Sequence, residues 1–123
     1  MSIFFILCVS IGILQIVENI KLLYQKGEQL LIDRSFSFLE FCWLLVAVWF
    51  LYQGGIPIIG IASISVFISY HVFGWLVAMK AYKLSEQDDS DTIVIPLWYF
   101  KISMGISLIF SILSYITFKE INA

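Results

Sequence analysis

The stretch from Gly54 to Met79 constrains this chain most, because more than twenty consecutive residues contain a single Asp, Glu, Lys, Arg or His, namely His71. An α-helix rises about 1.5 Å per residue, so about 20 such residues cross the ~30 Å hydrocarbon core of a bilayer. The whole chain is 61% hydrophobic and 13% charged, whereas a soluble domain carries about 25% charged residues. A water-soluble fold of this length cannot bury that much apolar surface. The sequence therefore predicts an integral membrane protein.

Four apolar segments are long enough to form membrane helices, which we predict over residues 3–24, 36–53, 56–79 and 95–118. Gly54, Gly55 and Pro57 form a short uncharged turn between the second and third segments, so these two helices are expected to be an antiparallel hairpin. The predicted fold is all-α: one membrane domain over residues 1–123, with four transmembrane helices in an up-down bundle and no soluble domain.

The distribution of Lys and Arg predicts the orientation of this bundle. The loops 25–35 and 80–94 and their flanks carry most of the positive charges, whereas the opposite side has only Lys119 and the terminal amine. Positively charged loops remain in the cytoplasm. We therefore expect a multi-pass protein of the inner (plasma) membrane, with both loops cytoplasmic and both termini outside.

Each predicted helix carries one ionisable residue in the half nearest these loops: Glu18, Glu40, His71 and Lys101. A charge near the bilayer centre costs about 2.5–3.5 kcal/mol on insertion scales, so such groups pair or line a wet cavity. We expect Lys101 to pair with Glu18 or Glu40 inside the bundle. This cluster has two interpretations: a structural one that fixes helix register, and a functional one in which the two glutamates carry protons or cations. A site for iron, manganese or zinc is not predicted, because there is one histidine and no Glu-x-x-His spacing.

A second pattern predicts a helix-contact face made of small and polar residues, which commonly mediate close contacts between membrane helices. On the fourth helix the serine stripe lies about 120° from Lys101, so both cannot point to one centre. If Lys101 points inward, the serines face a side wall or another protein. The predicted contact residues are Gly12, Gln15, Asn19, Ser103, Ser107 and Ser111.

Charge and motifs limit the possible functions. The formal net charge is −2 without a Lys/Arg cluster, which argues against nucleic acid as a partner. The sequence has no nucleophile–base pair, metal motif or phosphate-binding loop, so we expect neither catalytic activity of its own nor a cofactor. In length, and in a glutamate early in the second helix and a histidine late in the third, the chain resembles DoxX-like four-helix proteins. The Gly-x-x-Lys-Leu ending of their first helix is absent, so no family is assigned.

Two functions follow from these features. The first is a small subunit of a homo- or hetero-oligomeric membrane complex, whose partners are the lipid bilayer and other membrane subunits or copies of itself. The alternative is a small proton- or cation-coupled transporter or channel that acts as an oligomer, with Glu18 and Glu40 as carriers.

Overall fold

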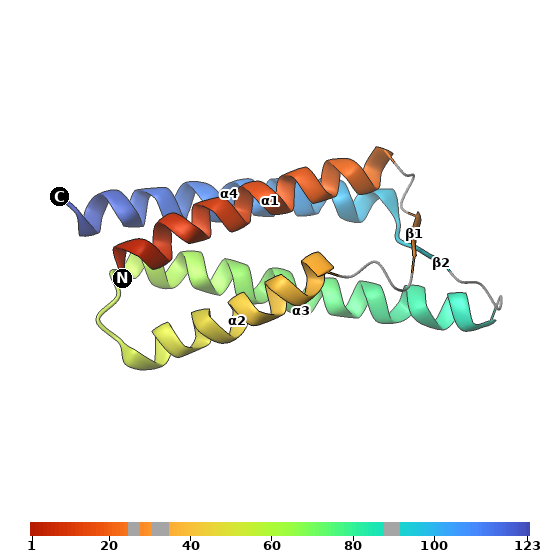
Figure 1. Cartoon of the computed structure of the whole chain (residues 1–123), viewed down its shortest axis with the longest axis horizontal. Helices are drawn as coiled ribbons and strands as arrows, with labels where there is room; N and C mark the ends of the chain where they lie inside the picture. The colour runs from red at the N-terminus through yellow and green to blue at the C-terminus, as the bar shows by residue number, and fades with distance from the viewer. Residues whose placement is uncertain (25–27, 31–34, 88–91) are drawn as a thin grey trace.

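The computed structural model describes residues 1–24, 28–30, 35–87 and 92–123. Four helices run antiparallel in an elongated bundle, with both termini and the α2–α3 turn at one end and two short strands at the other (Figure 1). The elements are α1 (Ser2–Tyr24), β1 (Glu28–Leu30), α2 (Ser35–Gln53), α3 (Ile58–Gln87), β2 (Thr92–Val94) and α4 (Leu97–Ile121).

Three of the four helices are long and apolar enough to cross a membrane: Ser2–Tyr24, the Ile58–Ala81 part of α3, and Leu97–Ile121. The second apolar helix, Phe38–Gln53, is shorter. In Figure 1, α2 begins well short of the two strands, whereas α3 extends past them. One end of the bundle therefore lacks α2.

The third helix differs from its predicted range of 56–79, because it continues to Gln87 into the predicted loop. The prediction ended this helix where hydrophobicity falls. However, the segment Ala81–Gln87 contains no Gly or Pro, and these residue types have adequate helix propensity. Loss of hydrophobicity marks the end of the apolar span and not the end of the helix.

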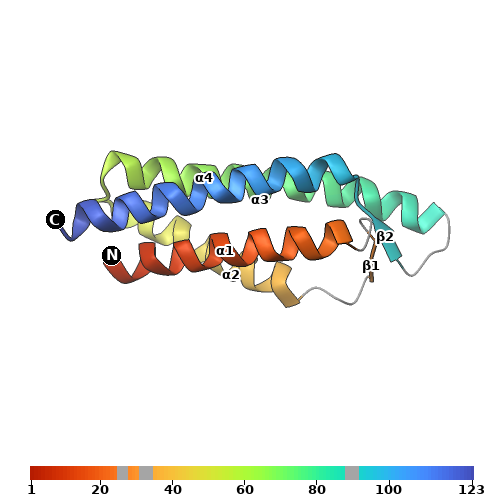
Figure 2. The same ribbon diagram turned by 90° about the horizontal axis from the view of Figure 1, so that it is seen from above.

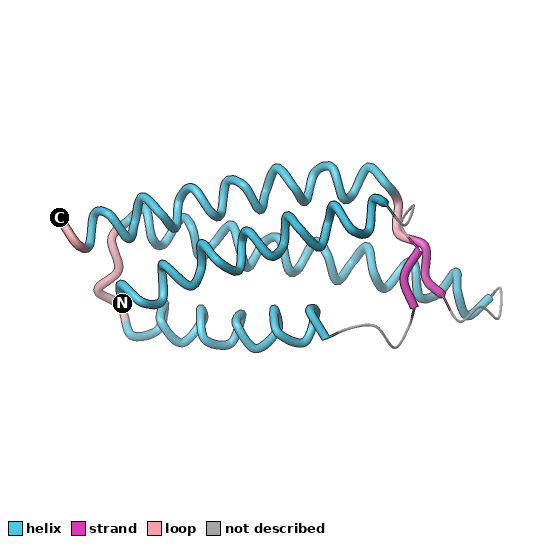
Figure 3. Tube along the Cα trace, turned by 45° about the horizontal axis from the view of Figure 1, so that its top comes forward, coloured by secondary structure: helices cyan, strands magenta, loops and turns pink. Residues whose placement is uncertain are grey.

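The two predicted loops contain a feature that the sequence analysis missed. Strands β1 and β2 pair in antiparallel register, with Glu28 opposite Val94 and Leu30 opposite Thr92 (Figure 3). Each strand has only three residues, which is too short for a period-two pattern to indicate it. The ribbon joins the loops at the same end of the bundle.

The turn between α2 and α3 has the sharp geometry that its glycines predict. Gly54 and Gly55 adopt φ values of 76° and 75°, a left-handed region that residues with a Cβ rarely adopt. The first turn of α3 then begins with the Ile61 amide donating to the carbonyl oxygen of Pro57 at 3.0 Å.

The bundle exposes large apolar side chains, and its interior contains polar side chains beside an apolar core. Large apolar side chains are exposed on all four helices, for example Ile3, Leu45, Leu76 and Ile109. An apolar surface of this extent suits contact with lipid. The interior instead contains many polar side chains: Gln15, Asn19, Glu40, Ser63, His71, Ser103, Ser107, Ser111, Ser114 and Thr117.

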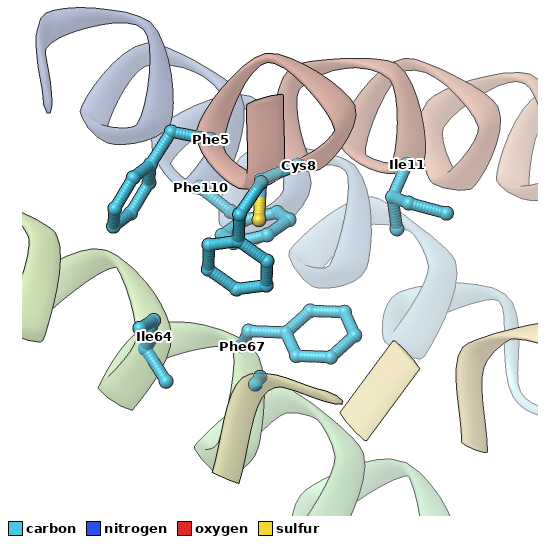
Figure 4. Packing of buried hydrophobic residues seen from close by; sticks show 8 residues of the cluster. Phe5, Cys8, Ile11, Ile64, Phe67 and Phe110 are labelled. Carbon is cyan, nitrogen blue, oxygen red and sulfur yellow. The ribbon is translucent and has the colours of Figure 1, made fainter. Parts of the chain in front are cut away.

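Helix α1 packs closely along α4, and α3 packs on both α4 and α2 (Figure 2). The close approach of α1 and α4 depends on Gly12, since a Cβ at this position would collide with Ser111 Oγ and lie 3.3 Å from the Ser107 carbonyl oxygen. An apolar cluster fills the half of the bundle that holds the termini (Figure 4). It comprises Phe4, Phe5, Cys8, Ile11, Ala47, Ile64, Phe67 and Phe110.

Candidate functional site

The interior of the bundle contains a carboxylate and an imidazole in contact. Glu40, on the second turn of α2, places Oε2 3.2 Å from Nε2 of His71 on α3. Only 11% of the Glu40 side chain and 6% of the His71 side chain are exposed. The two atoms are within ion-pair distance. Their geometry is not that of a hydrogen bond, so His71 Nε2 has no hydrogen-bond partner within the described part of the chain.

His71 lies far from both ends of the apolar part of its helix, whereas Glu40 lies near the start of α2. His71 is about 20 Å along the axis from Ile58 and about 15 Å from Ala81, the two ends of the apolar part of α3. Both ends are therefore too distant for the imidazole to reach bulk water by extending its side chain. Any charge on this pair must be stabilised inside the bundle.

The bundle interior contains further polar groups that are not satisfied, and at least one of them lies beside the pair. Gln15 of α1 neighbours the Glu40 carboxylate and is 2% exposed. Buried polar atoms usually have a partner, and an orphaned one costs about 1–3 kcal/mol. Within the described residues, five such atoms have none: Gln15 Nε2, Asn19 Nδ2, His71 Nε2, Ser103 Oγ and Ser107 Oγ.

Two tyrosines that the sequence analysis did not single out belong to this site. The Tyr70 hydroxyl neighbours Asn19, Ser103 and Tyr99. It also lies near the carboxyl group of Glu40. Tyr99 in turn neighbours Ser103. A signal was available: Tyr99 precedes Ser103 by four residues, which places both on one face of a helix.

Of the four ionisable residues predicted to cluster, the structure brings Glu40 and His71 into contact. Glu18 is half-buried and is a neighbour of Glu40. Lys101 does not join them, because its side chain is exposed on α4. The predicted pairing of Lys101 with Glu18 or Glu40 inside the bundle is wrong. The serine stripe occupies the inward face of α4, and Lys101, on another face of this helix, points outward.

The six residues of the predicted helix-contact face are all buried: Gly12, Gln15 and Asn19 on α1, with Ser103, Ser107 and Ser111 on α4. Gly12 meets Ser111 directly. Part of this face is therefore a contact between two helices of the same chain. Its other part, formed by Gln15, Asn19 and Ser103, lines the site around Glu40.

The ligand set of the site does not suggest a metal centre. Among the described residues, no three His, Cys, Asp or Glu side chains come together in a way that could hold a metal ion. The unpartnered nitrogens at this site are amide and imidazole groups beside one carboxylate.

Comparisons with known proteins add no relative to this description. No protein-family model, curated protein or solved structure matches the chain.

Proposed function

We propose that this chain is a membrane protein that binds and passes protons at Glu40, in proton-coupled transport or in proton conduction. The observation that carries this proposal is the buried contact of Glu40 with His71, in a bundle where His71 Nε2 and four other buried polar atoms have no hydrogen-bond partner among the described residues. An ionisable residue within a membrane span is expensive, and it usually marks an ion or proton pathway.

The donor chemistry favours a proton over a metal cation. Hard cations take six or more oxygen ligands, but among the described residues no three His, Cys, Asp or Glu side chains come together to hold a metal ion. Three of the five unpartnered atoms are nitrogens of Gln15, Asn19 and His71. An amide NH₂ group donates hydrogen bonds and does not ligate a cation. A proton needs none of the missing oxygen ligands.

His71 gives both protonation states of Glu40 a partner. An ionised Glu40 is compensated by an imidazolium 3.2 Å away, whereas a protonated Glu40 beside a neutral imidazole leaves no charge at this position. Neither state leaves an uncompensated charge inside the bundle, which is the costly case. The pair is therefore suited to exchange a proton repeatedly.

The other function suggested by the sequence is a small subunit of a larger membrane complex. This function has less support from the packing of the helices. Its basis in the sequence is a set of contact faces that point in more than one direction. The serine stripe of α4 packs inside this chain, with Ser111 against Gly12. What favours the alternative is Lys101, an exposed ammonium on the apolar helix α4, although a lysine one turn from a helix end can also extend to the interface.

The test is proton flux into liposomes that contain the purified chain and a trapped pH-sensitive dye, driven by a potassium diffusion potential. We expect flux above that of empty liposomes, and we expect Glu40→Gln to reduce it by roughly tenfold or more, since the amide cannot take up a proton. Glu120→Gln is the matched control, because Glu120 is exposed at the end of α4.

Equal flux in the wild type and Glu40→Gln contradicts the proposal. Absence of flux in every sample also contradicts it, provided that intact-mass measurement in a gentle detergent shows the chain in fixed ratio with other polypeptides. That combined result would establish the subunit function instead.

A further inference from the structure

The buried hydroxyls of α4 are of two kinds, depending on which side of Glu40 they lie. Toward the termini, Ser111 donates to the Ser107 carbonyl oxygen at 2.9 Å, Ser114 bonds Ser63 at 2.7 Å, and Thr117 donates to the Leu113 carbonyl oxygen at 2.7 Å. From Ser107 toward the ribbon, Ser107 and Ser103 have no partner among the described residues. The unsatisfied polar atoms thus occupy one side of the bundle.

The two halves of the bundle have different buried side chains. Toward the termini, Phe67 packs edge-on against His71, with ring centroids 4.6 Å apart. Phe67 also stacks on Phe110 at 4.9 Å, and both rings are labelled in Figure 4. This cluster is apolar, and the buried hydroxyls on its side of the bundle, those of Ser63, Ser111, Ser114 and Thr117, all have hydrogen-bond partners. Toward the ribbon, a second buried cluster contains Leu22, Ala81, Ile95, Phe100 and Tyr99. Tyr99 is the one described member of that cluster with a hydroxyl.

The Tyr99 hydroxyl is directed into the bundle by a gap in α3. A Cβ at Gly74 would lie 2.7 Å from the Tyr99 hydroxyl oxygen and 3.8 Å from the ring carbon that bears it. Gly74 lies one turn after Tyr70 on the same helix. The absence of a side chain at Gly74 therefore admits the Tyr99 hydroxyl to the space beside Tyr70 and Ser103.

We propose that the hydroxyls of Tyr99, Ser103 and Tyr70 relay protons between Glu40 and the end of the bundle with the β1–β2 ribbon. This inference rests on the proposed function and assigns its entry side and relay residues. Asn19, whose amide nitrogen has no partner among the described residues, neighbours the Tyr70 hydroxyl.

The relay is balanced at each hydroxyl. An oxygen accepts a proton from the ribbon side through a lone pair and releases its own proton to the next oxygen, so no hydroxyl changes its net charge after a transfer. The last proton binds a carboxylate oxygen of Glu40. The titratable groups that face Glu40 are Glu18 from α1, Tyr70 and His71 from α3, and Tyr99 from α4.

The experiment compares four variants in the same liposome flux assay. Tyr99→Phe and Tyr70→Phe remove one hydroxyl each and retain the ring, and Gly74→Ala displaces the Tyr99 hydroxyl without removing it. Tyr115→Phe is the matched control, since Tyr115 is an exposed tyrosine on α4. We expect the first three to lower flux by roughly tenfold or more and the control to retain it.

A second measurement separates the relay from the proton site. Infrared difference spectra between acidic and alkaline pH report the C=O stretch of a protonated Glu40, identified by its loss in Glu40→Gln. We expect Tyr99→Phe and Tyr70→Phe to keep this band, because Glu40 still equilibrates slowly. Normal flux in both tyrosine variants, with flux lost in Glu40→Gln, overturns the relay and leaves the proposed function standing. Loss of the band in the tyrosine variants also overturns it, because these residues would then shape the proton site. Normal flux in Glu40→Gln overturns both proposals.

Discussion

At the scale of single residues, the hydrogen bond between Ser63 and Ser114 offers a direct measurement of a polar contact inside this bundle. The two Oγ atoms are 2.7 Å apart, and both residues are fully buried. We expect a double-mutant cycle of Ser63→Ala and Ser114→Ala to give a coupling energy of about 0.6 kcal/mol, the average for such contacts in a membrane bundle. Reversible unfolding in mixed detergent micelles measures it. Because the double variant leaves no orphaned hydroxyl, additive single effects would contradict the contact.

The candidate site was predictable from single residues only in part. Glu40 and His71 were identifiable because an ionisable group in an apolar segment is unusual. Lys101 met the same criterion but is exposed, because a periodic pattern gives the angle between two stripes and not which one faces inward. Tyr70 and Tyr99 were missed because tyrosine is common at membrane interfaces, so its presence alone does not indicate a buried hydroxyl.

At the scale of elements, the packing of α1 on α4 depends on Gly12. We expect Gly12→Leu to lower the free energy of unfolding by about 1–3 kcal/mol, the usual effect of overpacking, because the new side chain must displace Ser111. Gly105→Leu is the matched control, since a Cβ there meets nothing within 4 Å. Both changes raise helix propensity equally, so the difference between their thermal unfolding midpoints reports the contact. Equal midpoints would contradict the close approach.

The helices were more predictable than the ends that join them. Hydrophobic length identifies an apolar helix because the helix must satisfy its own backbone in lipid. The end of α3 at Gln87 and the β1–β2 ribbon are decided outside the apolar segments. There, water can satisfy the backbone as well. Hydropathy therefore carries no information about either feature.

At the scale of the whole molecule, the antiparallel bundle has two chemically distinct ends. Lys21, Lys80 and Lys83 lie toward the ribbon, whereas Lys119 lies near the C-terminus. Positively charged flanks remain cytoplasmic, so we expect the ribbon end inside the cell and the termini outside. This orientation also places the proposed proton entry on the cytoplasmic side.

Single cysteines at Gln87 and Asn122 test this orientation, because both residues are exposed and lie at opposite ends of the bundle. The background carries Cys8→Ala and Cys42→Ala, which remove the free thiols. A membrane-impermeant maleimide should label Asn122→Cys in intact cells and Gln87→Cys only after permeabilisation. The reverse pattern would place the ribbon outside and invert the direction of proton entry. Labelling of both sites in intact cells would contradict a bundle that spans the membrane, since helices with apolar surfaces on all sides separate these two positions.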